Sequence, residues 1–392
     1  MYFVGIDIAK RFHEAAIIDE QGKVIIKRIK FQNSHSGFCK LMEAVRKLNQ
    51  PVEFAMEATG HYWFSLYAHL RQDNQTVRVI NPLQSDALRG LFIHETKTDA
   101  IDAFIIAEVV RIGRYSNTEI LPEDIHALRE LCRQRFYVID MTSDIKRKII
   151  ALLDQVFPEY EKLFSDTFGV TSMELLANYS TPEQILSVDS QTLAELLQKA
   201  SRGRFGLDKA NQIQECARNS FGIIIASSSL SLIIRQYIEQ LKNFESCIEI
   251  FDAEIAKIYD SFDCQLHTIT GIGKTLAAVI FSEIGGDISK FPTVPKLVAY
   301  AGLYPTNRQS GESINSKGRL SKRGSPYLRR AIWLSAFVAS SKDPAIRQFY
   351  ERKRLEGKNH LNAMGHVCHK MLSIIFAVLR DNKAYIPAQI SS

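Results

Sequence analysis

The chain has 392 residues, more than a single hydrophobic core usually holds, so two or three domains are expected. Its 46% hydrophobic and 23% charged residues are typical of a globular protein and exclude a disordered chain. The six cysteines include no Cys-x-x-Cys pair, which favours reduced thiols over disulfides or a structural zinc site. We see no apolar run as long as a membrane span, and the acidic Asp7 interrupts any signal peptide, so a cytoplasmic protein without membrane contact is expected.

The net charge of +6 is unevenly distributed along the chain. Residues 1–120 carry a net +1, residues 121–289 carry −8, and residues 290–392 carry +13. So basic a carboxyl-terminal segment in an otherwise acidic protein predicts a polyanionic partner, most plausibly nucleic acid.

The first 118 residues alternate the signals of strands and helices. Strands are predicted at residues 2–9, 14–19, 24–31, 52–56 and 77–80, and helices at 36–48 and 62–71, with a hairpin turn at Gln21-Gly22. Three strands joined by short turns, followed by strands that alternate with helices, predict an α/β domain with a mixed sheet flanked by helices. This is the order of elements in a ribonuclease-H-like fold.

Residues 119–265 have the periodicity of helices. Apolar stripes run through residues 128–153 and 230–262, and a Ser/Thr-rich stretch lies between them. Two interpretations remain open from this pattern: an antiparallel coiled-coil arm that carries something at its tip, or a compact helical bundle.

Residues 266–392 are predicted to form a third, mainly helical domain. Gly271-Ile272-Gly273 predicts a turn that opens a helix over residues 276–284, with backbone amides that contact a DNA phosphate. A phosphate-binding P-loop is excluded, because Thr268 stands where that motif requires its first glycine.

Further along, six basic residues fall within fourteen positions that contain no acid: Lys317, Arg319, Lys322, Arg323, Arg329 and Arg330. We interpret them, together with Arg308, as contacts to nucleic-acid phosphates; the alternative is a solvated charged face.

Four acidic residues form the most informative pattern. Asp7 lies within one apolar, strand-like run and Glu57 ends another, and a carboxylate without a partner is costly to bury in such a strand. Asp99 and Asp102 are three residues apart and share one face of a predicted helix. Together they predict a site for Mg²⁺ or Mn²⁺, ions that prefer oxygen ligands and support phosphodiester cleavage. Considered alone, Asp99 and Asp102 could instead stabilise the N-terminus of a helix by offsetting its dipole. Asp7 alone could be a buried hydrogen-bond acceptor.

Several of these motifs resemble one family, the transposases of the IS-one-ten family of bacterial insertion sequences. Around the acids they are residues 5–10, 56–60 and 97–103; in the third domain they are residues 271–273, 301–305, 309–311, 321–324 and 328–330. The first set resembles that family's RuvC-like domain, and the second its carboxyl-terminal transposase domain.

The resemblance implies a recombinase in which Asp7, Glu57, Asp99 and Asp102 hold metal while a serine in a Ser-Gly motif, here Ser310, attacks DNA. Many relatives carry a second serine directly before it, where this chain has Gln309. Ser313 and Ser316 are close enough to be rivals. The resemblance also implies double-stranded DNA at the element ends and target, a structured guide RNA, and a dimer or tetramer.

The sequence leaves three other functions to compare. A metal-dependent nuclease, such as a junction resolvase, would share the four acids but need no serine. An actin-like kinase is disfavoured, because bulky and charged residues follow Asp7 where small ones are required. A nucleic-acid binder without enzymatic activity would need neither the acids nor the serine.

Overall fold

The computed structural model describes residues 1–58, 60–90, 98–113, 115, 121–306, 309–310, 313–314 and 319–387. At residues 83, 306, 309, 310, 313, 314 and 319 it describes the backbone alone. The contacts divide the chain into two compact units, Met1–Ile120 and Leu121–Ser392. The first boundary lies two residues beyond the predicted end of the amino-terminal domain.

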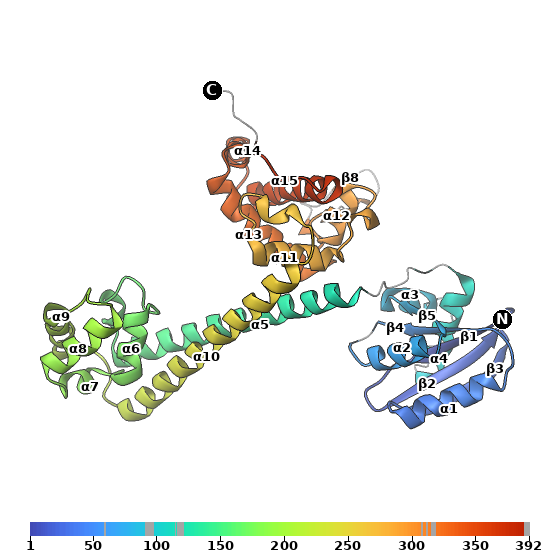
Figure 1. Cartoon of the computed structure of the whole chain (residues 1–392), viewed down its shortest axis with the longest axis horizontal. Coiled ribbons are helices and arrows are strands. Elements are labelled where there is room, and N and C mark those ends of the chain that lie inside the picture. Colours follow the sequence, from blue (N-terminus) through green and yellow to red (C-terminus); the bar gives the residue numbers. More distant parts are fainter. Residues whose placement is uncertain are drawn as a thin grey trace. The chain divides into compact units, whose positions relative to one another are not determined.

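The first unit is built on a five-stranded mixed sheet (Figure 1). Its strands are β1 (Tyr2–Asp7), β2 (Phe12–Asp19), β3 (Val24–Gln32), β4 (Val52–Glu57) and β5 (Thr76–Ile80), in the order β3-β2-β1-β4-β5. The neighbours β1–β2 and β2–β3 are antiparallel, whereas β1–β4 and β4–β5 are parallel. The predicted mixed sheet is confirmed, and each strand agrees with its predicted range to within two residues.

Helices cover both faces of this sheet. On one face, alternate apolar residues of the strands pack against α1 (His35–Arg46) and α2 (Trp63–Gln72). On the other face the core is formed with α4 (Asp99–Ile112), beside the short helix α3 (Pro82–Arg89). Because side chains alternate along a strand, residues 3, 5 and 7 of β1 face α4.

Gly5 lets α4 cross β1 at close range. A Cβ atom at this position would lie 2.0 Å from the carbonyl oxygen of Ala103 and 2.9 Å from the Cβ of Ala107. Any side chain here would therefore push the helix off the strand. The glycine fixes the first turn of α4 next to the end of β1.

The second unit contains two long helices, α5 (Glu123–Val156) and α10 (Ser227–Tyr259), which lie side by side. The start of α5 shares one hydrophobic core with the end of α10, and its end shares another with the start of α10, so the two helices are antiparallel. The predicted pair of long helices is confirmed, while coiled-coil interlocking of their side chains stays a prediction. The second core is completed by α6 (Val170–Asn178), α7 (Pro182–Leu186), α8 (Ser190–Ala200) and α9 (Leu207–Arg218).

The first of these two cores belongs to the carboxyl-terminal part of the chain. It is formed with α11 (Lys274–Ile284), α12 (Val294–Tyr300), α13 (Pro326–Lys342), α14 (Pro344–Leu355) and α15 (His360–Asp381). Four two-residue strands lie between α12 and α13: β6 (Pro305–Thr306), β7 (Gln309–Ser310), β8 (Ser313–Ile314) and β9 (Arg319–Leu320). The predicted mainly helical character of this region is confirmed.

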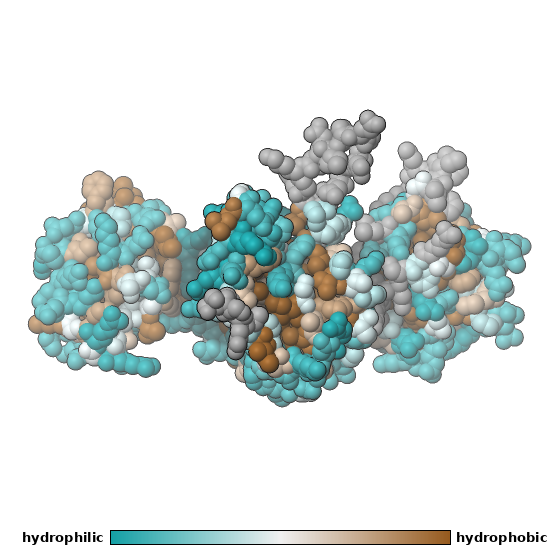
Figure 2. Space-filling model, turned by 90° about the horizontal axis from the view of Figure 1, so that it is seen from above, coloured by the Kyte–Doolittle hydropathy of each residue, from teal (hydrophilic) through white to brown (hydrophobic). Residues whose placement is uncertain are grey.

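Among the described residues, α15 alone has the length and apolarity of a membrane-spanning helix. Half of its apolar window is buried in the carboxyl-terminal core, where Met364, Val367 and Met371 have no exposed surface. Its hydrophobicity is therefore explained by packing against other helices. On the face drawn in Figure 2, hydrophilic side chains predominate, with apolar patches between them.

Candidate functional site

The sheet brings Asp7 and Glu57 to one edge. They are the last residues of the neighbouring parallel strands β1 and β4, and both follow alternate residues that face α4. Asp99 and Asp102 lie in the first turn of α4, which Thr98 caps by accepting a hydrogen bond from the backbone N–H of Ile101. This capping is the ordinary structural role of a residue such as Thr98 at a helix N-terminus.

The negative charges of the other three predicted acids act on Asp7. The pKa of the half-buried Asp7 is raised to about 7, first by burial and then by the negative charges of Asp102, Asp99 and Glu57. A fifth carboxylate contributes as well: Glu14, directly opposite Asp7 on β2, is buried and paired with Arg28. We call the group of Asp7, Glu57, Asp99 and Asp102 the carboxylate edge.

Two of these acids already have partners on α3, a helix that we had not predicted. Arg89 places Nη2 2.8 Å from Oδ1 of Asp102, while Nη1 lies 2.7 Å from Oδ1 of Asp86. Ser85 donates a hydrogen bond from Oγ to Glu57. A signal for this helix was present in the sequence, since Asn81-Pro82 is the kind of dipeptide that starts a helix.

The carboxylate edge has the chemistry of a divalent-metal site without the closed geometry of one. Its donors are oxygens, as Mg²⁺ and Mn²⁺ prefer, and its crowded negative charge would be relieved by a cation. In the described part of the chain, however, no three His, Cys, Asp or Glu side chains stand close enough to hold one ion together. The guanidinium of Arg89 supplies positive charge at Asp102 instead, so this ion pair would have to open before Asp102 became a ligand.

Ser310 lies in β7, one of the four short strands between α12 and α13. Strand β6 pairs with β9, and β7 pairs with β8 so that Ser310 stands opposite Ser313. We call these four paired strands the serine hairpin. Ser316, Arg308 and Lys317, three other residues singled out in the sequence, lie outside the described residues. For Ser310 and Arg319 only the backbone is described.

Arg329 ties together the two ends of the chain segment that forms this hairpin. Its Nη1 atom donates to the backbone carbonyls of Ala301 and Lys322, each at 3.2 Å. Gly302 makes room for this contact, because a Cβ there would lie 2.6 Å from Nη1 of Arg329, and its φ of +69° suits glycine. The guanidinium predicted to meet phosphate is thus used within the chain.

A buried ion pair supports the same region. Glu283 is 1% exposed and accepts hydrogen bonds from Arg133 at 2.7 Å and from Ser325 at 2.7 Å. Ser325 also caps α13, the helix that carries Arg329. This network anchors the start of α13 to α5.

The other residues predicted to contact nucleic acid differ in whether they already pair with a residue of this chain. Arg330 forms a two-pronged ion pair with Asp140 at 2.7 and 2.8 Å and lies over the ring of Phe136. Lys322 and Arg323 are exposed and form no ion pair with any described residue. Among the described side chains of this group, these two are available to an external phosphate.

Comparison with known proteins connects both regions to one family. A family model described as Transposase matches residues 4–158, and another, described as Transposase IS116/IS110/IS902 family, matches residues 264–351. The chain is 25% identical to an uncharacterized protein of insertion element IS110 from Streptomyces coelicolor, over 98% of this chain and 95% of that protein.

Two further relatives are named for what they do. The mini-circle putative transposase for IS117 from Streptomyces coelicolor is 25% identical, over 98% of this chain and 95% of its own length. The pilin gene-inverting protein of Moraxella lacunata is 24% identical, over 98% of this chain and 97% of its own length. The two family models together cover both ends of the chain in order, around the carboxylate edge and the serine hairpin. The chain therefore belongs to the IS110 family of transposases, enzymes that recombine DNA.

Proposed function

We propose that this transposase cuts and rejoins DNA through a covalent link between Ser310 and a DNA phosphate, supported by divalent metal at the carboxylate edge. The metal half of the proposal is carried by the placement of Asp7 and Glu57 at the ends of adjacent parallel strands, on the sheet face that packs against α4, whose first turn holds Asp99 and Asp102. The negative charges of these neighbours add to burial in raising the pKa of Asp7. Several carboxylates so close together repel one another in the metal-free protein, and such groups are typical of sites that bind a cation.

The four acids and Ser310 have different roles in this proposal. Asp7, Glu57, Asp99 and Asp102 would hold Mg²⁺ or Mn²⁺, which supplies positive charge against the charge that develops on the phosphate oxygens. The Ser310 hydroxyl attacks phosphorus, and the bond from phosphorus to the leaving sugar oxygen breaks. The phosphodiester energy is kept in the serine ester, so that attack by a DNA hydroxyl rejoins the strand without ATP.

The proposal extends to the partners. The exposed Lys322 and Arg323, in a segment with a net charge of +13, support contact with nucleic-acid phosphates. From the resemblance of the motifs we propose double-stranded donor and target DNA, a structured guide RNA that pairs with both, a dimer or tetramer, and a cytoplasmic location.

A covalent-trapping experiment tests the serine. The full chain is incubated with Mn²⁺, guide RNA and labelled DNA carrying the element ends, then denatured, and protein-linked label is counted. We expect an adduct with the native chain and none with Ser310→Ala, which should still bind the DNA. Ser313→Ala is the matched control, because Ser313 stands opposite Ser310 in the same ladder. A labelled peptide modified at any residue other than Ser310 would reject the assignment.

A metal-dependent nuclease of the junction-resolvase type is the second candidate. It is favoured by one observation: all four acids of the carboxylate edge come from the first unit, which needs no serine hairpin to assemble them. Metal-dependent cutting that persists in Ser310→Ala, with no adduct in the native chain, would establish this alternative.

A further inference from the structure

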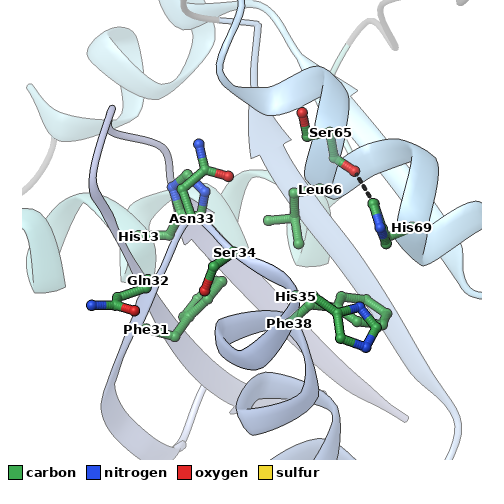
Figure 3. A pocket seen from close by; sticks show the side chains of 10 residues that line it. All are labelled: His13, Phe31, Gln32, Asn33, Ser34, His35, Phe38, Ser65, Leu66 and His69. Carbon is green, nitrogen blue, oxygen red and sulfur yellow. Dashed lines mark hydrogen bonds between the residues drawn. The ribbon is translucent and has the colours of Figure 1, made fainter.

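A cavity of about 250 Å³ lies on the opposite face of the same sheet, among β2, β3, α1 and α2 (Figure 3). Three aromatic side chains line one side: His35 and Phe38 from α1, and His69 from α2. Their ring centroids are 5.6 to 6.5 Å apart. Polar side chains of Gln32, Asn33 and Ser34, between β3 and α1, line the other side. A planar group with polar edges matches this lining.

His13 adds a buried polar group to the cavity lining. The residue is 1% exposed, and burial lowers the pKa of its imidazole, which favours the neutral ring, while the neighbouring Asn33 opposes this shift. Because Nδ1 accepts a hydrogen bond from the backbone N–H of Ala9 at 3.2 Å, the proton lies on Nε2. Nε2 meets no acceptor at bonding geometry among the described residues. In Figure 3 its ring lies directly behind the Asn33 amide.

The cavity and the carboxylate edge share one end of the sheet. His13 and Glu14 are consecutive on β2 and point to opposite faces: His13 toward the cavity, and Glu14 toward Asp7. The turn between β1 and β2 separates the two and exposes Lys10 and Arg11. A nucleic-acid backbone that crosses this basic turn would have a phosphate on the side of Asp7 and a base on the side of His13.

We propose that this cavity binds one unpaired nucleobase of the strand that the carboxylate edge acts on. The inference rests on the proposed function only in taking that edge as the place where a strand is cut. The volume supports a single base, since it lies below the range of about 300 to 1,000 Å³ that is usual for whole small-molecule ligands.

The lining offers both kinds of contact that proteins use for unpaired bases. Phe38 and His69 supply ring faces for stacking, which accepts any base. Asn33 presents an amide that can donate and accept, and its Nδ2 also donates a long hydrogen bond to the carbonyl of Lys10, at 3.5 Å. Stacking holds the base, and the amide reads its edge.

Abasic scanning tests the proposal. Single-stranded DNA and RNA, each with one abasic position moved along the strand, are bound to the full chain in EDTA, so that no strand is cut. At one position, removal of the base should weaken binding to the native chain by about 5- to 150-fold. The variant Phe38→Ala/His69→Ala should bind the intact strand correspondingly less well and show no further loss at that position. Whether DNA or RNA gives the effect identifies the source of the base.

Two controls make the result decisive. Gln72→Ala changes an exposed residue at the end of α2 that does not line the cavity, and it should keep the full abasic effect. His69→Ala alone removes an exposed ring with little risk to folding, and it should lose part of the effect. Equal abasic losses in native and variant proteins at every position would overturn the proposal. Because this assay requires neither metal nor Ser310, its outcome is independent of the covalent-trapping result.

Discussion

The carboxylate edge and the serine hairpin are held by different means. The acids of the edge end core strands or begin a core helix, and their placement depends on the contact between Gly5 and α4. The serine hairpin consists of paired two-residue strands, and the ends of its segment are joined by the hydrogen bonds of Arg329. A change at the edge is therefore expected to affect folding, whereas a change in the hairpin affects local order.

The largest effect is expected at Gly5. Gly5→Ala places a Cβ within 2.0 Å of the carbonyl of Ala103, so α4 must move, and we expect the first unit to lose about 3 kcal/mol or more of stability. Urea unfolding followed by circular dichroism measures the loss. Gly90→Ala is the control, because its new Cβ would meet the nearest atom at an ordinary 3.5 Å. A loss no larger than that of the control would mean that the close approach is not required.

A smaller and local effect is expected at Arg329. Arg329→Ala removes two hydrogen bonds between a charged group and backbone carbonyls, worth about 1 to 3 kcal/mol together. Hydrogen exchange should speed up in residues 300–325 while the helical cores keep their protection. Arg330→Ala removes an equal charge from the neighbouring residue and should leave that segment unchanged. Uniform loosening of the whole unit would contradict the local role.

The charge crowding at Asp7 predicts a pH dependence with a definite sign. Its folded pKa of about 7 lies above the ordinary 3.8, so the folded state binds the proton more tightly, and stability falls as pH rises between these values. In EDTA, Asp7→Asn should be more stable than the native chain at pH 8 by about 1–2 kcal/mol, after discounting for partial exposure. The difference should vanish near pH 3. Unfolding curves at several pH values measure it, and greater stability of the native chain at pH 8 would refute the crowding.

The smallest effect per residue is expected at the exposed cations. Replacing Lys322 and Arg323 by alanine should lower the slope of log K against log salt for duplex DNA by up to about 0.9 per lost phosphate contact. Arg330→Ala matches each single replacement in charge, and its guanidinium already pairs with Asp140, so it should lower the slope less than either Lys322→Ala or Arg323→Ala. An unchanged slope in the double variant would show that these residues face only solvent.

Much of the first unit could be predicted because its signals are local. Apolar runs and the Gln21-Gly22 turn located the strands, and four acids in the order strand, strand, helix predicted one shared site. Arg89 could not be predicted as a partner of Asp102, because nothing in sequence spacing shows which acid a guanidinium reaches.

In the basic segment, too, the sequence did not show which partner each cation has. Six cations within fourteen positions predicted phosphate contacts, but Arg329 and Arg330 meet carbonyls and a carboxylate of their own chain. Charge density in a sequence does not distinguish an anion supplied by a ligand from an acceptor supplied by the fold. His13 was missed for a related reason, since its burial depends on α1 and α2 packing over β2.

The antiparallel pair α5 and α10 also sets the angle, about the helix axis, between the two hydrophobic cores that it joins. Each end of α5 is embedded in a different hydrophobic core, and an uninterrupted helix advances about 1.5 Å and turns about 100° per residue. Adding one residue to both long helices would therefore rotate the α6–α9 core by about 100° about the helix axis. Its distance from the carboxyl-terminal core would change by only about 1.5 Å. Seven added residues would nearly restore the original angle. The number of residues in these helices thus sets the angle between the two cores, and insertions of whole helical turns should preserve that angle.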